Sequence, residues 1–291
     1  MDILTNYTFQ IVALGSVILA VAAAPVGAFS VYKGQSLIGD AIGHSTFPGI
    51  ILAYMAFATR SPVILLAGAI AAGAASYALI QLAHRDKRLG LDANLAIFLS
   101  GFFGLGMALK SFIQGNPDYA GASQAGLGTY IFGQAAYMLE ADVLLIAAVS
   151  ALVLTLLLLF YKELKLFVFD AEYAEVVGLP CRLLNLLLLV MTIAVIGIGI
   201  KAVGAILISS FLIIPCVAAN QWSNNFARVL LLSSLIGAVS ALVGTYISTL
   251  EQGMSTGPSI ILVASLIAFF SIVFGTKGIL GRVLKRRRTH G

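Results

Sequence analysis

Asp40 and His44 are the two residues of this sequence whose types and spacing best suit a chemical task. The chain contains three histidines, and His44 is the one that lies within a long apolar stretch. On a helix, residues four apart stack on one face, so the Asp40 carboxylate and the His44 imidazole would point at one spot. An oxygen and a nitrogen ligand at one spot suit a divalent cation such as manganese, zinc or iron.

The spacing of this pair leaves two roles open, contact with a metal ion or a structural contact between the two side chains near the inner interface. An ionised aspartate inside a bilayer is costly, so such residues usually mark ion paths or proton relays. Two ligands do not fill a coordination shell, so other segments must supply the rest. Other residues of an ion path are expected among the polar residues and prolines that lie within or at the ends of the predicted spans. These candidates are Asp92, Asn94, Ser209, Ser210, Pro215 and Asn220.

The chain around these residues is far too apolar for an ordinary soluble domain. Of its 291 residues, 60% are hydrophobic and 10% are charged, and the mean hydropathy is +1.03. Since a helix needs about 20 apolar residues to cross a bilayer, this composition predicts a single all-α transmembrane domain over residues 1–291 with about nine spans. The predicted spans are Phe9–Tyr32, Leu37–Ala58, Pro62–Ala83, Leu91–Ile113, Ala141–Tyr161, Leu183–Ile200, Val203–Ala219, Val229–Leu250 and Pro258–Gly275.

The positions of lysine and arginine predict the orientation of the bundle, because short cytoplasmic loops are rich in these residues. Nine spans with the N-terminus outside and the C-terminus in the cytoplasm place most basic residues inside, including the run Lys285–Arg288. Eight spans are the alternative, in which the sixth and seventh segments fuse and that run lies outside. The net charge of +5 is therefore interpreted as a topological signal and not as a nucleic-acid site.

Prolines and glycines within the spans predict how the helices bend and pack. Pro48 and Pro215 each fall inside a predicted span, where a broken helix often lines a transport path and a simple kink is the alternative. Glycines let helices approach closely in lipid, and packing is the role expected for nearly all of them. They include Gly68, Gly73, Gly101, Gly104, Gly106, Gly197, Gly199 and Gly204.

The segment from Gln35 to Gly49 carries the pattern Gly-Asp-Ala-x-x-His-x-x-x-Pro-Gly around the Asp40–His44 pair. This pattern resembles the signature of the manganese/zinc/iron ABC-transporter permease family. Three other segments agree with that family in order and spacing: Phe169–Gly178, Val203–Pro215 and Ser255–Val263. The resemblance implies a multi-pass permease of the bacterial cell membrane in which Asp40 and His44 contact the metal. The metal is then cargo, and no permanently bound cofactor is expected.

The same resemblance implies protein partners. Cytoplasmic ABC ATPase subunits and an extracellular or periplasmic metal-binding protein are expected. Residues Gln124–Leu127 and Phe132–Ala136 resemble the subgroup in which two different permeases pair, so the second permease is expected to be a paralogue or an identical copy. Membrane lipid surrounds the assembly, and nucleic acid is not expected.

The loop at about residues 162–182 is the largest predicted cytoplasmic loop, and it is acidic where basic residues are the rule. That charge indicates a basic surface on a partner, with a solvated helix as the alternative. In the family this stretch corresponds to the coupling helix that docks on the ATPase, and Ala171 replaces its commoner proline. The residues implied in coupling are Asp170, Glu172, Tyr173, Ala174 and Gly178.

Nucleotide hydrolysis is not expected of this chain, because the phosphate-binding pattern Gly-x-x-x-x-Gly-Lys-Ser/Thr does not occur. The His-Glu-x-x-His pattern of metalloproteases is missing as well. The hypothesis is import of a divalent metal, manganese before zinc or iron, by alternating access that a partner ATPase drives. An ion-coupled secondary carrier and a permease for a metal chelate are the alternatives.

Overall fold

The computed structural model describes residues 6–59, 61–84, 90–116, 119, 138–204, 208–250 and 254–281. Within these ranges the chain forms helices and no β-strand, as the composition predicts. The principal helices are α1 Tyr7–Tyr32, α2 Ser36–Phe57, α3 Pro62–His84, α4 Leu91–Gly115, α7 Glu140–Leu159, α8 Tyr161–Phe169, α9 Ala171–Val176, α10 Cys181–Val203, α11 Ile208–Asn220, α12 Phe226–Leu250 and α13 Thr256–Phe274.

Each predicted span coincides with one of these helices, and seven of the helices are long and apolar enough to cross a membrane. The other two are α2, whose 22 residues include Asp40 and His44, and α11, which has 13 residues. At 1.5 Å per residue α11 is about 20 Å long, less than the hydrocarbon core of a bilayer. Its described part begins at Ile208, five residues after the predicted start, whereas α10 continues to Val203 and ends at Gly204, whose φ of 96° favours glycine.

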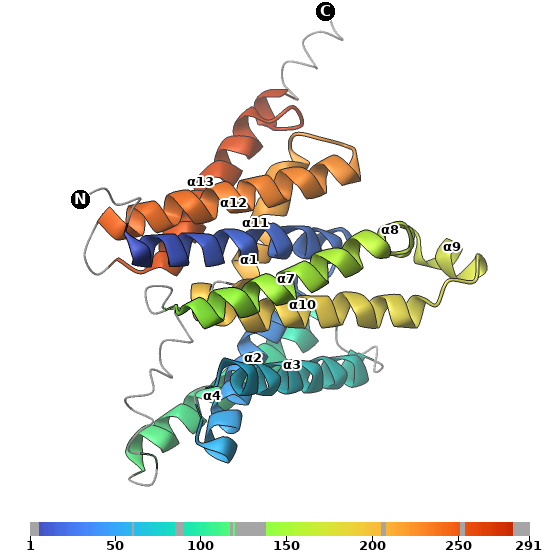
Figure 1. The fold of residues 1–291 in the computed structure, drawn as a ribbon. Helices are drawn as coiled ribbons and strands as arrows, with labels where there is room; N and C mark the ends of the chain where they lie inside the picture. The colour runs from blue at the N-terminus through green and yellow to red at the C-terminus, as the bar shows by residue number, and fades with distance from the viewer. Residues whose placement is uncertain are drawn as a thin grey trace, which may run out of the picture.

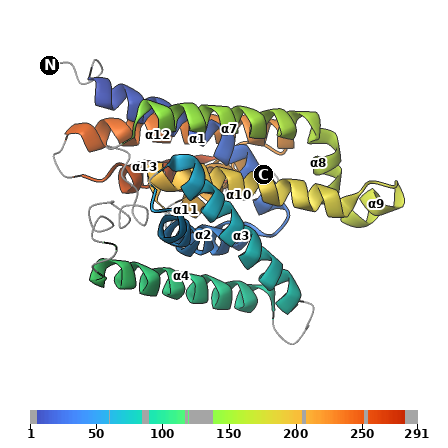
Figure 2. The same cartoon turned by 60° about the horizontal axis from the view of Figure 1, so that its bottom comes forward.

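Helix α1 lies at the centre of the bundle and contacts α7, α10, α11 and α12 (Figure 1). In the most apolar stretch of α1, 72% of the residues are buried, whereas in the corresponding stretch of α4 11% are buried. Helix α1 is therefore the core helix, and α4 lies at an edge. Helices α2, α3 and α4 form a second group, which joins the first where α2 packs on α10 and α11 (Figure 2). Helix α2, which carries the Asp40–His44 pair, is therefore the main link between the two groups, and α3 adds a contact with α10.

The helices continue through both prolines, which contradicts a break at either position and leaves the kink that was the alternative. Helix α2 includes Pro48, and α11 includes Pro215. A proline removes one intrahelical hydrogen bond and crowds the preceding turn, which a transmembrane helix tolerates when neighbouring side chains and helices compensate. Because Pro48 has no backbone N–H, the carbonyl of His44 in the candidate site lacks the hydrogen bond that residue 48 would otherwise donate to it.

Glycines at helix crossings set how closely the helices approach, as predicted for Gly68. A Cβ atom on Gly68 would lie 2.4 Å from the carbonyl oxygen of Gly49, where α3 crosses α2. A Cβ atom on Gly27 of α1 would lie 2.0 Å from the carbonyl oxygen of Leu212 on α11. Gly101 of α4 differs, since nothing described lies within 4 Å of the Cβ position there.

Replacing Gly27 with alanine is expected to destabilise the protein by roughly 1–3 kcal/mol, because the added methyl group forces α1 and α11 apart. Gly101→Ala is the matched control, since it adds the same atom to a helix where there is room. It should leave the melting temperature in detergent unchanged or raise it slightly, because alanine favours the helix. Equal melting temperatures for the two variants would contradict the close contact between α1 and α11.

Candidate functional site

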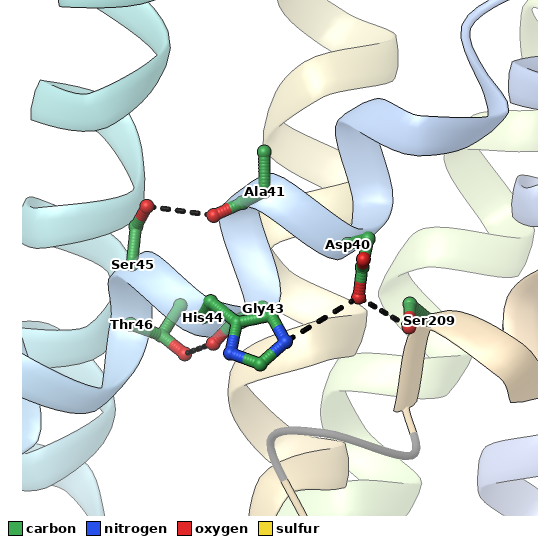
Figure 3. Close-up of polar contacts among 7 residues, drawn as sticks. All are labelled: Asp40, Ala41, Gly43, His44, Ser45, Thr46 and Ser209. Carbon is green, nitrogen blue, oxygen red and sulfur yellow. Dashed lines mark hydrogen bonds and ion pairs between the residues drawn. The ribbon is translucent and has the colours of Figure 1, made fainter. Parts of the chain in front are cut away.

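The Asp40 and His44 side chains meet on one face of α2, as their spacing predicts (Figure 3). The Nε2 atom of His44 lies 3.6 Å from Oδ1 of Asp40. This separation is longer than an ordinary hydrogen bond, so the pair is not closed on itself. The His44 side chain is 12% exposed and that of Asp40 is 31% exposed, so the carboxylate opens toward its surroundings.

The separation fits two ligands of one cation. Transition metals bind imidazole nitrogen and carboxylate oxygen at about 2.1 Å, and two such ligands at a tetrahedral angle lie about 3.4 Å apart. A divalent ion could therefore contact both atoms with little change in either side chain. Among the described residues no group of three or more histidine, cysteine, aspartate or glutamate side chains could hold a metal ion. Within the described residues, the candidate site therefore consists of the two ligand atoms of Asp40 and His44.

Ser209 completes the surroundings of the carboxylate. Its hydroxyl donates a hydrogen bond of 2.9 Å to Oδ1 of Asp40 (Figure 3). Ser209 is the second residue of α11, so the carboxylate lies beside the first turn of that helix. The positive end of the helix dipole and the hydroxyl both lower the cost of a negative charge at this depth.

The imidazole is held in place by an aromatic ring but lacks a second polar partner. The ring of Phe103 on α4 packs edge-on against His44, with centroids 5.0 Å apart. The buried Nδ1 atom of His44 has no hydrogen-bond partner in the part of the chain that the structure describes. Leaving such a group unsatisfied costs about 1–3 kcal/mol, which is easier to understand if His44 serves transport than if it serves stability.

The hydroxyls of Ser45 and Thr46, which follow His44, have hydrogen-bond partners outside the pair. Ser45 donates to the carbonyl of Ala41 at 2.6 Å, and its hydroxyl oxygen shares a hydrogen bond of 2.7 Å with the Ser76 hydroxyl of α3. Thr46 donates to the carbonyl of Gly43 at 2.6 Å (Figure 3). These bonds fasten α2 to α3 and hold the turn that presents His44, so both hydroxyls have structural roles.

The other predicted path residues are spread along the bundle, and Ser209 is the one with a contact to Asp40. Ser210 is half-buried, and Pro215 is buried further along α11. Asn94 is buried near the start of α4, and its amide nitrogen has no hydrogen-bond partner among the described residues. Asn220 lies at the far end of α11 from Ser209. The side chain of Asp92 lies outside the described residues.

The predicted coupling loop forms an arm of two short helices, α8 and α9, which projects beyond the ends of α7 and α10 (Figures 1 and 2). Asp170 begins α9 by accepting a hydrogen bond of 2.9 Å from the amide of Tyr173. Gly178, with a φ of 87°, ends it, and the amide of Leu179 bonds the carbonyl of Ala174. This arrangement is a Schellman motif, which needs glycine at that position.

The arm separates the predicted coupling residues into two groups. Asp170 and Gly178 shape α9, whereas Glu172 and Tyr173 are exposed on it. Ala174 is fully buried against the rest of the arm. Ala171 occupies the first helical position, where proline is favourable but not required, which explains how the chain tolerates the departure from the family pattern.

Two exposed valines at the tip of the arm were missed by the sequence reasoning. Val176 is 84% exposed and Val177 is 55% exposed, beside Tyr173 at 55%. We call Tyr173, Val176 and Val177 the tip face. Adjacent valines in a polar, acidic loop are the signal that could have found it, since exposed apolar patches commonly mark protein contacts.

The base of the arm is fastened to the loop between α1 and α2. Lys33 donates a hydrogen bond to the side-chain oxygen of Asn185 on α10, and its ammonium lies 4.8 Å from the ring centroid of Phe167 on α8. Burial lowers the pKa of Lys33 to about 8. The arm therefore contacts the segment that leads directly into α2.

Comparison with known proteins shows the family of this chain. Residues 5–275 match the ABC 3 transport family. The chain belongs to that family. The resemblance seen around Asp40 and His44 is thereby confirmed. The zinc transport system membrane protein TroC of Treponema pallidum is 39% identical over 99% of this chain and 96% of its own. The manganese transport system membrane protein MntC of Bacillus subtilis is 38% identical over 96% of this chain, which spans 65% of that longer protein.

Two solved structures have folds similar to that of this ABC 3 transport family member. A structure described as PsaBC from Streptococcus pneumoniae in complex with Fab matches with a TM-score of 0.84 and 26% identity, over 98% of this chain and 96% of that one. An inward-facing conformation of a putative metal-chelate type ABC transporter matches with a TM-score of 0.69 and 18% identity, over 90% of this chain and 85% of that one. At that identity the second likeness concerns the fold alone.

Proposed function

We propose that this chain is the transmembrane permease subunit of an ABC importer that carries a divalent transition metal, manganese or zinc, into the cytoplasm. It is a multi-pass protein of the bacterial cell membrane. The observation that carries the proposal is the Asp40–His44 pair, whose two ligand atoms lie 3.6 Å apart with Ser209 beside them. Relatives named for zinc and for manganese transport support it, whereas the iron considered from the sequence has no such support.

The proposed topology has nine spans, with the N-terminus outside and the arm of α8 and α9 inside. In this arrangement the ends of α7 and α10 that carry the arm face the cytoplasm, where an ATPase subunit docks on the tip face. ATP hydrolysis belongs to that partner, since this chain carries no phosphate-binding loop pattern. A metal-binding protein delivers the ion on the other side, and a second permease, identical or paralogous, completes the path.

Alternating access explains why a two-ligand site is sufficient. A carrier must bind the ion in one state and release it in another, and only a difference in affinity between states drives the change. Two ligands from one chain hold the ion while those from a second chain or from water complete its shell. When the ligands of the second chain move away from Asp40 and His44, the affinity of the site for the ion falls. The ion can then leave without being displaced by a competing ligand.

The test is uptake of radiolabelled manganese and zinc into proteoliposomes that contain this chain with its ATPase and metal-binding protein. ATP-dependent accumulation is expected for at least one of the two ions, with no dependence on a proton or sodium gradient. Accumulation without the ATPase, driven by an ion gradient, would instead indicate a secondary carrier. Uptake of a metal chelate but not of the free ions would indicate the chelate permease.

A further inference from the structure

Five aromatic rings at the base of the arm join three helices. Phe29 and Tyr32 come from α1, Tyr161 and Phe169 from α8, and Phe226 from α12. Phe226 contacts all four of the other rings, with centroid separations from 4.9 to 6.4 Å. These separations are those of favourable aromatic pairs. A displacement of the arm therefore presses on the end of α1, because side chains packed at this density do not yield independently.

Tyr32 connects this aromatic cluster to α11. Its ring lies 5.3 Å from that of Phe169, the last residue of α8 before the arm turns. Its hydroxyl donates a hydrogen bond of 3.0 Å to the side-chain oxygen of Asn220, the last residue of α11. Lys277, which follows α13, donates to the same oxygen at 3.3 Å. Asn220 thus fixes the end of α11 to the aromatic cluster on one side and to the α13 end on the other.

The opposite end of α11 holds the candidate site. Ser209 bonds Asp40, and the twelve residues from Ser209 to Asn220 belong to one helix, whose rise between these two residues is about 16 Å. The helix is packed along its length, with Phe211, Leu212 and Cys216 all buried. Its close contact with Gly27 of α1 keeps it from tilting freely. A short, buried helix fastened at both ends moves as a unit, so a shift at Asn220 reaches Ser209.

We propose that the hydrogen bond between Tyr32 and Asn220 is the joint that carries movement of the arm into α11 and on to the Asp40 carboxylate. Tyr32 and Asn220 are then positioning residues, which act on the ion through α11 and do not touch it. This inference rests on the proposed function and adds a route by which ATPase movement reaches the site. It also gives Asn220 a role that differs from the path contact predicted from the sequence.

The test is the number of metal ions imported per ATP hydrolysed by the reconstituted complex. Tyr32→Phe keeps the ring in the cluster and removes the hydroxyl, so this ratio is expected to fall roughly threefold to tenfold, the worth of one hydrogen bond. The ATPase rate and assembly with the ATPase should match those of the wild type. Asn220→Ala should lower the ratio as well, and the double variant should lower it no further than the worse single variant.

Tyr161→Phe is the matched control, because it removes a hydroxyl from the same cluster that has no hydrogen-bond partner among the described residues; its ratio should equal that of the wild type. A normal ratio in Tyr32→Phe overturns the proposal. So does an equal loss in Tyr161→Phe, which would indicate general loosening of the cluster, or fully additive losses in the double variant. A wild-type complex that hydrolyses ATP without importing metal overturns the proposed function itself.

Discussion

Alanine at Asp40 or at His44 is expected to lower ATP-driven uptake of manganese or zinc by at least about 10–100-fold, since even the partner of a metal ligand contributes that much. Each substitution removes one of the two ligand atoms of the proposed site. Asp40→Ala also removes the negative charge that lowers the cost of placing a cation between α2 and α11, within the apolar helices. The measurement is the initial rate of uptake into proteoliposomes, normalised to the amount of assembled transporter.

Two comparisons separate loss of the site from loss of the fold. Asp40→Asn keeps the size of the side chain and can still accept the bond from Ser209, so it should assemble normally and yet transport poorly. His290→Ala is the control for histidine removal, because this residue lies in the C-terminal tail far along the chain from α2. Wild-type uptake in both Asp40→Ala and His44→Ala would place the ion path elsewhere in the bundle.

Much of the architecture was predictable because a bilayer restricts the choices. Backbone groups in hydrocarbon must be satisfied within the helix, so long apolar stretches between charged residues translate directly into helices. The least accurate boundary was the start of α11, which was predicted just after Lys201, whereas α10 continues past that lysine to Val203 and ends at Gly204. The glycine itself was noted, but hydropathy alone cannot tell a packing glycine from one with a positive φ.

The candidate site was predictable only where its members share a helix. Because Asp40 and His44 are four residues apart, their side chains lie on the same face of α2, and the structure shows them close together as expected. Ser209 and Phe103 come from α11 and α4, and their places beside the pair depend on how α2 packs between these helices. No periodicity within one segment encodes such a crossing, which is why Ser209 stood among several equal candidates and Phe103 was not among them.

Lysine in place of Val176 is expected to weaken association with the ATPase by at least about 30-fold, which corresponds to roughly 2 kcal/mol. Val176 is 84% exposed at the tip face and would be buried when a partner docks there. The acidic residues of the arm indicate a basic partner, so a lysine meets like charge as well as losing apolar contact. The measurement is the dissociation constant of the purified permease and ATPase in detergent.

The choice of lysine keeps α9 intact, because a cation at the last residue of a helix is favourable to its dipole. The hydrogen bonds that begin and end α9 involve Asp170 and Gly178, which the substitution leaves in place. Asn224→Lys is the matched control, since it adds the same charge to the exposed loop between α11 and α12 at the same end of the bundle. It should bind the ATPase like the wild type. If Val176→Lys also binds normally, the ATPase docks on a different surface, and the arm is not the element that couples ATP hydrolysis to the site.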